Sequence, residues 1–593
     1  MLDSRIYRAA LPPIIVAVII AAFSLSNRPA PLTTSLAPDV FSGPAAMQLL
    51  SGLVGEAGPP GGVKDQQLAS SIATDFTNAD FPQVRTYADQ ARTIDGERSL
   101  DTVVAVRPGT LNGSIVLMAH RDVSGPRSEW GAELSGTAAL LELAQTFGSA
   151  ANCKINCAGR IFQHTIVLVS TSGGTGGNGG ASAFVGHIPA PVDAALVLGD
   201  VAGTVTRRPF VLPFSDGGNL APQLLQRTLT GALQTEAADA PGEPDLTSQF
   251  VHLALPLTLG EQGVLNKAGL PAVLLQVSGE RGPTAAERAP SENRMSNVGQ
   301  GALRALNALD SGLTGALAPS ASLVIHNQLL PEWPVRLLVL ALLGPVLLAA
   351  VDGLARAGRR REPLSADLIW ALSCAVPFLL AGVLAELLRA SGALTSAPSL
   401  PVPPGSIPVA GGVIAALIIF WVLGWLLRAG ALRITLRVPR PRPGAAGVML
   451  TLVLALGTLI VWALNPYAAL LLVPAAHLTL LVAVEDSPLP RPAIAGALLL
   501  GLLAPAAVIA LHAHELSMSF GQTLWMVLLL VAGGYGGVLA LLLGSLVLGV
   551  VSGSLILAVR PRPVRVAPAV TVRGPVGYAG PGSLGGTESA LRR

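Results

Sequence analysis

Two polar side chains, His120 and Asp122, stand at the end of an apolar run of strand length that begins at residue 114. After a polar loop, Ser135 and Gly136 open a segment whose apolar residues recur at helical spacing. In sheets covered by helices, ligands and chemistry are found at the carboxyl ends of the strands. We therefore expect the functional site to be built around this unit of strand, polar cluster and helix.

The elements that must position these residues are a sheet and the helices on its two faces. Apolar runs of strand length alternate with helical patterns from residue 47 to about 309, which is typical of a parallel or mixed sheet between helices. The expected strands include 102–107, 114–119, 166–170 and 195–198, and a helix is expected over 65–76. The sequence thus predicts an α/β domain with a mixed, mostly parallel sheet over 47–330.

The unit of strand, His-x-Asp, loop and Ser-Gly helix resembles the di-zinc aminopeptidases, whose relatives include the glutaminyl cyclases, the transferrin receptor and nicastrin. The resemblance spans roughly 47–309 and continues through TIVLVSTSGGTGGNGGASAFV (165–185), ALVLGDVAG (195–203) and LNKAGLPAVLL (265–275). It implies a zinc-exopeptidase fold. In that family two zinc ions activate a bridging water, and a glutamate removes its proton.

Some positions of the family's metal site keep a suitable residue here. His120 matches a ligand of the first zinc ion, Asp200 matches a later ligand of that ion, and Asp122 matches the carboxylate that orients the imidazole. The bridging aspartate is replaced by Ala132, although Glu133 beside it could serve if the loop is shifted. The resemblance leaves His120, Asp200 and Glu133 as residual candidates for metal binding.

Other positions of the family's site have lost their functional groups. The general base and a ligand of the second zinc fall on Gly174 and Thr175, and the family's distant histidine falls in 284–297, where Glu287 or a neighbour takes its place. Carboxylates packed together are stable only with cations between them, so loss of the metal favours uncharged residues there. We expect no catalytic residue and no cofactor, with zinc bound only if the site is residually active.

The composition predicts a membrane protein. The 593 residues are 51% hydrophobic and 12% charged, and the net charge of +3 argues against a nucleic-acid partner. An apolar run over 11–25, preceded by Arg5 and Arg8, predicts an uncleaved signal anchor within 1–28. A Pro/Ser/Thr-rich linker over 29–46 follows it.

The second half of the chain predicts an all-α polytopic membrane domain over 331–560. Seven apolar segments are expected, at 335–351, 366–388, 407–427, 445–464, 467–484, 492–511 and 522–542. With the anchor they make eight crossings. A total of nine crossings is the alternative, because the glycines at 533–537 could divide the last apolar stretch into two. The Pro/Gly/Ser-rich residues 561–593 predict a disordered cytoplasmic tail.

Arginine clusters predict the orientation of the chain in the membrane. Arg359 to Arg361 and the arginines between Arg428 and Arg442 belong in the cytoplasm by the positive-inside rule. The α/β domain then lies outside the cytoplasm, and we expect a bacterial inner membrane. In that compartment a disulfide between Cys153 and Cys157 is favoured over two free thiols.

Three functions are compatible with this arrangement, which is similar in architecture to the luminal subunit of the GPI transamidase complex. The first is a non-catalytic, peptidase-like component of a membrane complex that binds a peptide or a protein partner as well as membrane lipids. The second is an active membrane-bound zinc aminopeptidase that uses Glu133. The third is a transporter or lipid-handling protein with an accessory α/β domain.

Overall fold

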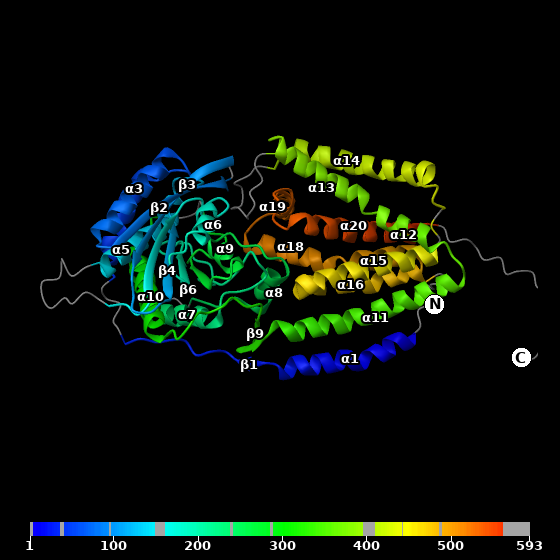
Figure 1. Ribbon diagram of the computed structural model, residues 1–593, viewed down its shortest axis with the longest axis horizontal. Helices are drawn as coiled ribbons and strands as arrows, with labels where there is room; N and C mark the ends of the chain where they lie inside the picture. Colours follow the sequence, from blue (N-terminus) through cyan, green and yellow to red (C-terminus); the bar gives the residue numbers. More distant parts are fainter. Residues whose placement is uncertain are drawn as a thin grey trace, which may run out of the picture.

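The structure is a computed structural model in which an α/β domain and a bundle of apolar helices lie end to end (Figure 1). It describes residues 4–35, 41–93, 96–148, 161–237, 241–284, 289–394, 409–439, 441, 443–484 and 489–560. Cys153, Cys157, Glu287 and the tail 561–593 lie outside these residues. The predictions made for them therefore stay predictions.

The α/β domain is built on a seven-stranded mixed sheet with the strand order β2-β3-β5-β4-β6-β8-β7. The strands are β2 (Gln83–Thr93), β3 (Gly96–Arg107), β4 (Ser114–His120), β5 (Thr165–Thr171), β6 (Val192–Leu198), β7 (Val211–Leu212) and β8 (Ala272–Leu275). The four central strands, β5, β4, β6 and β8, are parallel, and the outer three pair antiparallel. The mixed α/β sheet expected from the sequence is thus confirmed.

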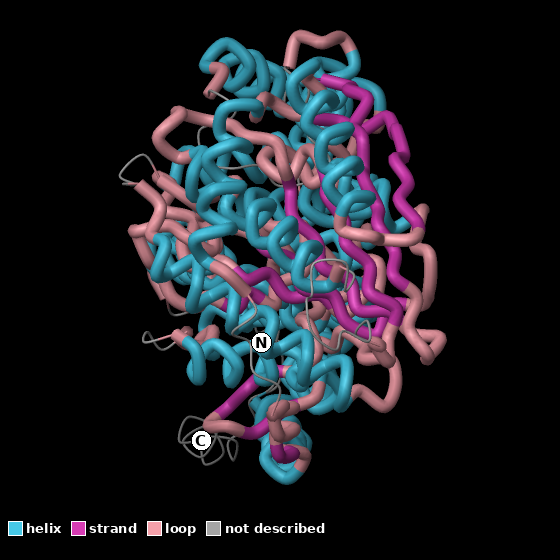
Figure 2. Tube along the Cα trace, turned by 90° about the vertical axis from the view of Figure 1, so that its left-hand side faces the viewer, coloured by secondary structure: helices cyan, strands magenta, loops and turns pink. Residues whose placement is uncertain are grey.

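Helices cover both faces of this sheet, as Figure 2 shows. Alternate residues of β4 divide between two cores: Ile115 and Leu117 pack with α2, α3, α5, α7 and α10, whereas Val116 and Met118 pack with α6, α8 and α9. Burial on both faces explains why the central strands are continuous apolar runs. The helices are α2 (Gly43–Glu56), α3 (Val63–Asn78), α4 (Trp130–Glu133), α5 (Ser135–Phe147), α6 (Gly179–Val185), α7 (Gln223–Glu236), α8 (Leu246–Ala254), α9 (Gln262–Lys267) and α10 (Glu292–Gly312).

The helix bundle contains α1 from the start of the chain and the helices that follow the α/β domain (Figure 1). These are α1 (Ser4–Phe23), α11 (Glu332–Arg359), α12 (Leu364–Ser373), α13 (Val376–Ala390), α14 (Gly411–Gly430), α15 (Pro443–Leu464), α16 (Pro466–Ala483), α17 (Arg491–Leu500), α18 (Leu503–Glu515), α19 (Phe520–Ala532) and α20 (Gly537–Val559). Among the described residues, seven helices are long and apolar enough to cross a membrane, and the bent pair α17 and α18 could add an eighth span.

The expected helix over 522–542 is two helices in the structure. The chain leaves the helical conformation between Ala532 and Gly537, and Gly534 and Gly537 have positive φ angles of 80° and 65°. Glycine adopts this left-handed conformation without the steric cost that a Cβ atom brings. The glycines therefore end α19 and let the long helix α20 begin at a new angle.

Among the contacts that join the bundle to the α/β domain are a small sheet and a shared apolar core. A small three-stranded sheet pairs β1 (Ser26–Asn27), which follows α1, with β10 (Gln328–Leu330), which precedes α11 and also pairs with β9 (Leu323–Ile325). In addition, Val335 and Val339 of α11 and Tyr467 of α16 are buried in the same core as Val116 of β4. The bundle thus completes the packing of one face of the sheet region.

Candidate ligand-binding pocket

A pocket of about 100 Å³ lies at the carboxyl ends of the central strands, where the sequence predicts the site. His120 ends β4, Asp200 follows β6, and the loop after β5 contributes Gly174 and Thr175. Five carboxylate groups line this pocket together with one imidazole and one guanidinium. These residues are Glu129, Glu133, Asp200, Glu261, Glu280, His120 and Arg281. The pocket is therefore strongly acidic.

His120 and Gly174 are in close contact. A Cβ atom added to Gly174 would lie 2.4 Å from both Cβ and Cγ of His120. Thr137 of α5 fixes the backbone here, because its hydroxyl donates a hydrogen bond of 2.5 Å to His120 O. The Nε2 atom of His120 is buried and has no hydrogen-bond partner among the described residues. The imidazole thus takes the space that a side chain at position 174 would need.

Asp122 holds the loop that carries Gly174 and Thr175. Its carboxylate accepts hydrogen bonds of 3.1 Å from both backbone N–H groups, and the Thr175 hydroxyl donates another of 2.5 Å. Within the described part of the chain no hydrogen bond joins Asp122 to His120. Asp122 thus shapes the loop in this structure, and its expected role in orienting the imidazole stays a prediction.

Asp200 is folded into the turn that follows β6. Its Oδ1 atom accepts hydrogen bonds from Gly203 N at 2.6 Å, Ala202 N at 3.2 Å and the Ser135 hydroxyl at 3.5 Å. The neighbouring Gly136 is needed for close packing, because a Cβ atom there would lie 2.2 Å from Leu198 O. The Ser-Gly pair thus seats the start of α5 against the end of β6.

Glu133 lies at the pocket, whereas Ala132 is buried beside it. The Oε2 atom of Glu133 accepts a hydrogen bond of 3.3 Å from Ser124 N. Burial raises the pKa of Glu133 well above its usual range, and the negative charge of Asp122 raises it further. A cation bound nearby would stabilise the charged form of this carboxyl group and lower its pKa.

Sequence reasoning missed Glu261, a buried carboxyl group that lines the same pocket as His120. The Thr171 hydroxyl donates a hydrogen bond of 2.5 Å to Glu261 Oε1, and Oε2 has no hydrogen-bond partner among the described residues. Burial raises the pKa of Glu261, while His120 acts in the opposite direction. Glu261 precedes the short helix α9 and follows no strand, so the pattern of strand ends gave no signal for it.

These residues do not fit the paired zinc ions that the resemblance implies. Ala132 and Gly174 have no ligand atom, and the Thr175 hydroxyl is used as a donor to Asp122. Among the described residues, a group of three ligand atoms within 4.8 Å of one another occurs elsewhere, at His252, His512 and Glu515, and not in this pocket. We therefore assign the pocket no metal-dependent step.

Comparison with solved structures finds similar folds that cover a little under half of this chain. Glutaminyl cyclase from Porphyromonas gingivalis is 16% identical, with 45% of this chain and 99% of that chain covered and a TM-score of 0.34. The zinc aminopeptidase BSAP from Bacillus subtilis is 10% identical, covering 46% and 97%, with a TM-score of 0.36. The LapA aminopeptidase of Legionella pneumophila is 14% identical, covering 46% and 72%, with a TM-score of 0.34. No family model and no curated protein matches the chain.

Proposed function

We propose that this chain is a membrane protein whose α/β domain binds the amino group of a peptide or protein partner in the acidic pocket and does not hydrolyse it. The observation that carries the proposal is the surplus of carboxylates in the pocket. Glu129, Glu133, Asp200 and Glu261 stand against one arginine, while the fifth carboxylate, Glu280, is paired with His252. Glu133 and Glu261 are each buried with a raised pKa, so a bound ammonium group would relieve their unfavourable environment. Arg281 at the same pocket can receive a carbonyl or carboxylate of the ligand.

The pocket lacks the chemical groups that peptide hydrolysis by two metal ions requires. In two-metal peptide hydrolysis the metals generate the nucleophile and a carboxylate takes its proton. The position of that carboxylate is Gly174, and the His120 imidazole occupies the space above it. Loss of general-base assistance alone costs about a hundred- to ten-thousand-fold in rate. Binding is the function that the remaining groups support.

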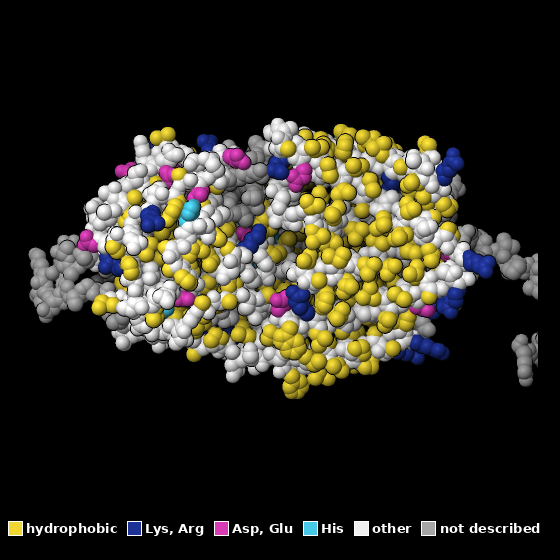
Figure 3. Space-filling view, viewed as in Figure 1, with side chains coloured by type: hydrophobic (Ala, Val, Ile, Leu, Met, Phe, Trp, Pro, Cys, Tyr) yellow, Lys and Arg dark blue, Asp and Glu magenta, His cyan; other side chains and the backbone are white. Residues whose placement is uncertain are grey.

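The arrangement of the bundle supports an orientation in a bacterial inner membrane. Figure 3 shows an apolar surface along the bundle and Lys and Arg side chains gathered at its end far from the α/β domain. Arginines occur at the helix ends there, with Arg5 and Arg8 in the first turns of α1 and Arg359 ending α11. By the positive-inside rule that end is cytoplasmic, so the α/β domain and its pocket lie outside the cytoplasm.

Calorimetry on the detergent-purified full chain tests the binding function. Alanyl-alanine amide, which has a free amino group, should bind, and its N-acetylated form should not. Glu261→Gln should weaken binding by about 10- to 100-fold, as expected for loss of one charge-assisted hydrogen bond. The exposed Glu97→Gln on β3 is the matched control and should bind normally.

Equal affinity for the free and acetylated peptides would contradict the proposed binding of an amine. Release of the N-terminal residue, abolished both by a chelator and by His120→Ala, would instead establish the active aminopeptidase. Both measurements use the same protein preparation, so the two functions are separated directly.

A further inference from the structure

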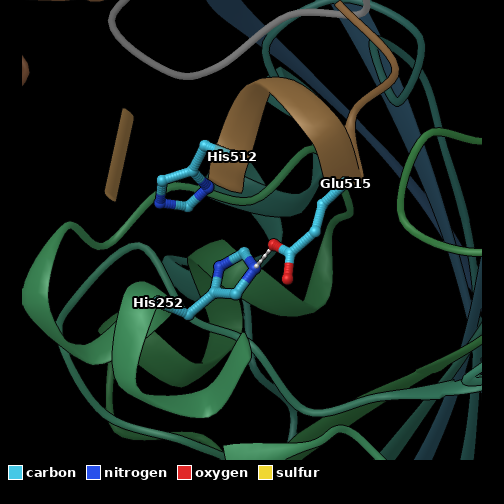
Figure 4. A group of neighbouring side chains, drawn as sticks. All are labelled: His252, His512 and Glu515. Atoms are coloured by element: carbon cyan, nitrogen blue, oxygen red, sulfur yellow. Dashed lines mark hydrogen bonds and ion pairs between the residues drawn. The ribbon is translucent and has the colours of Figure 1, made fainter. Parts of the chain in front are cut away.

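Two histidines and two glutamates come together where the α/β domain meets the helix bundle, and one of them, Glu280, also lines the acidic pocket. His252 lies in the last turn of α8, Glu280 follows β8, and His512 and Glu515 lie in the last turn of α18. Ligand atoms of His252, His512 and Glu515 lie within 4.8 Å of one another, and Figure 4 shows the three side chains converging. The His252 Nε2 atom lies 3.0 Å from Glu280 Oε2 and 3.1 Å from Glu515 Oε2.

The two imidazoles are buried, and their nitrogen atoms are incompletely satisfied. His252 is 0% exposed and His512 is 1% exposed. His512 Nε2 lies 3.0 Å from Leu255 O, and since a carbonyl only accepts, this nitrogen carries the hydrogen. The lone pair of His512 is therefore on Nδ1, which has no hydrogen-bond partner among the described residues. Oε1 of Glu280 is buried without a hydrogen-bond partner in the same part of the chain.

We propose that His252, His512 and Glu515 bind one divalent transition-metal ion, with zinc the best match. Two imidazole nitrogens and one carboxylate oxygen make a three-ligand set of the kind zinc takes, with bonds of about 2.0–2.2 Å and a fourth position left for water. Glu280, whose Oε2 lies 3.0 Å from His252 Nε2, adds a second negative charge beside the ion. The ion would use the lone pair of His512 Nδ1 and neutralise the two carboxylates. His512 and Glu515 are three residues apart, so they lie on one face of α18, and a cation at this helix's carboxyl end is favoured by its dipole.

The surroundings of the cluster suit a metal ion that exchanges with solvent. The ring of Phe214 stacks on His252 with centroids 3.6 Å apart, which fixes the imidazole plane. Glu280 and Glu515 also line a cavity of about 650 Å³ at the junction, together with Arg207 and Arg208. This cavity gives an ion and water a path to the two carboxylates.

The site would join the two parts of the molecule. His252 and Glu280 belong to the α/β domain, whereas His512 and Glu515 belong to the bundle. Metal bonds from His252 on one side of this boundary and from His512 and Glu515 on the other hold α8 against α18. Removal of the metal is therefore expected to loosen the junction without changing the sheet.

Metal analysis of the full-length protein in detergent tests the site. Protein loaded with Zn²⁺ and passed through gel filtration should retain about one equivalent, and loading with Co²⁺ should give the visible ligand-field absorption of a tetrahedral N/O site. His512→Ala and the isosteric Glu515→Gln should each weaken metal binding roughly a hundred-fold or more. His514→Ala, at a neighbouring histidine that lines the same cavity, is the matched control and should retain the metal.

Thermal unfolding gives a second readout that does not depend on an activity. A chelator should lower the Tm of the wild-type protein and of His514→Ala, and should leave the Tm of Glu515→Gln unchanged, because only a protein that binds the ion is stabilised by it. Wild-type protein that takes up neither Zn²⁺ nor Co²⁺ would overturn the proposal and leave His252 as an imidazolium held between two carboxylates. Retention of the metal by both His512→Ala and Glu515→Gln would overturn it as well.

Discussion

At the scale of single residues, the contact between His120 and Gly174 decides which side chains the pocket can hold. The imidazole lies where a side chain at 174 would have to be, so these two positions cannot both carry the residues that the aminopeptidase resemblance requires without rearrangement. The sequence showed the missing glutamate but not this contact, because Gly174 is 54 residues from His120 and only the fold brings the two together.

Gly174→Ala should therefore destabilise the protein, and removal of the imidazole should cancel the effect. Inserting one methyl group into a filled space costs about 1–3 kcal/mol. His120→Ala vacates that space, so in the double variant Gly174→Ala should have little further effect on stability. Thermal unfolding of the wild type, both single variants and the double variant forms a double-mutant cycle. Additive effects of the two changes would contradict the proposed contact.

The buried carboxyl group of Asp216 is expected to make the stability of the protein depend on pH. It is 4% exposed, and its Oδ1 accepts hydrogen bonds from Tyr535 Oη at 3.1 Å and Thr258 N at 3.3 Å. Burial raises the pKa of Asp216 to about 7, against the effect of these two hydrogen bonds and of Lys267, and with a further increase from Glu280. In the unfolded chain the pKa is close to 4, so folding favours the protonated form.

Stability from Asp216 should be complete below about pH 4 and lost as pH rises towards 7, where the folded protein must carry a buried charge. A shift of this size corresponds to about 4 kcal/mol. Asp216→Asn keeps the acceptor atom and removes the charge, so it should raise the Tm at pH 8 and leave it nearly unchanged at pH 4. Thermal unfolding at the two pH values measures the difference. A Tm lowered equally at both would show that the carboxyl group acts by hydrogen bonding alone.

At the scale of elements, the central strands were predicted because burial on both faces leaves unbroken apolar runs, as in Ile166 to Val169. The outer strand β2 was not predicted, because its sequence QVRTYADQART is mostly polar. It is a strand because it pairs along its whole length with β3. Glu261 was missed for a related reason. Its place depends on the tertiary position of the segment before α9, which no local periodicity encodes.

Arg121 joins several of these elements beneath the pocket. It is fully buried, and its Nε lies 2.9 Å from Asp65 Oδ1 of α3. Its other nitrogens donate to Ser170 O of β5 at 3.1 Å and to Asp101 O of β3 at 2.8 Å. The guanidinium thus satisfies a carboxylate and two backbone carbonyls from three different elements.

Arg121→Met should destabilise the fold by about 3–5 kcal/mol, because it leaves Asp65 charged and buried without its partner. Asp65→Asn in the same chain should recover part of the loss, since the amide oxygen still accepts from Gly61 N and the Ser172 hydroxyl. Circular dichroism during thermal unfolding compares the three proteins. An Arg121→Met variant as stable as the wild type would show that Asp65 is already neutral in the native state.

At the scale of the whole molecule, the predicted orientation can be tested by labelling. In a chain whose native cysteines are replaced, Ser70→Cys on the exposed face of α3 should react with a membrane-impermeant maleimide in cells whose outer membrane is permeabilised. Gly358→Cys, exposed near the carboxyl end of α11, should react only after the inner membrane is opened. The reverse pattern would place the α/β domain in the cytoplasm.

The shared core also determines the order in which the chain can finish folding. Val116 of the sheet is synthesised long before Val339 and Tyr467, which complete the apolar layer on its side of the molecule. The contacts of His252 and Asp216 with Glu515 and Tyr535 are made later still, after α18 and α19 have been synthesised. Until those helices have packed against it, the newly made domain exposes an apolar face. A cell producing this protein must therefore keep a nearly finished domain from aggregating while the rest of its chain is made.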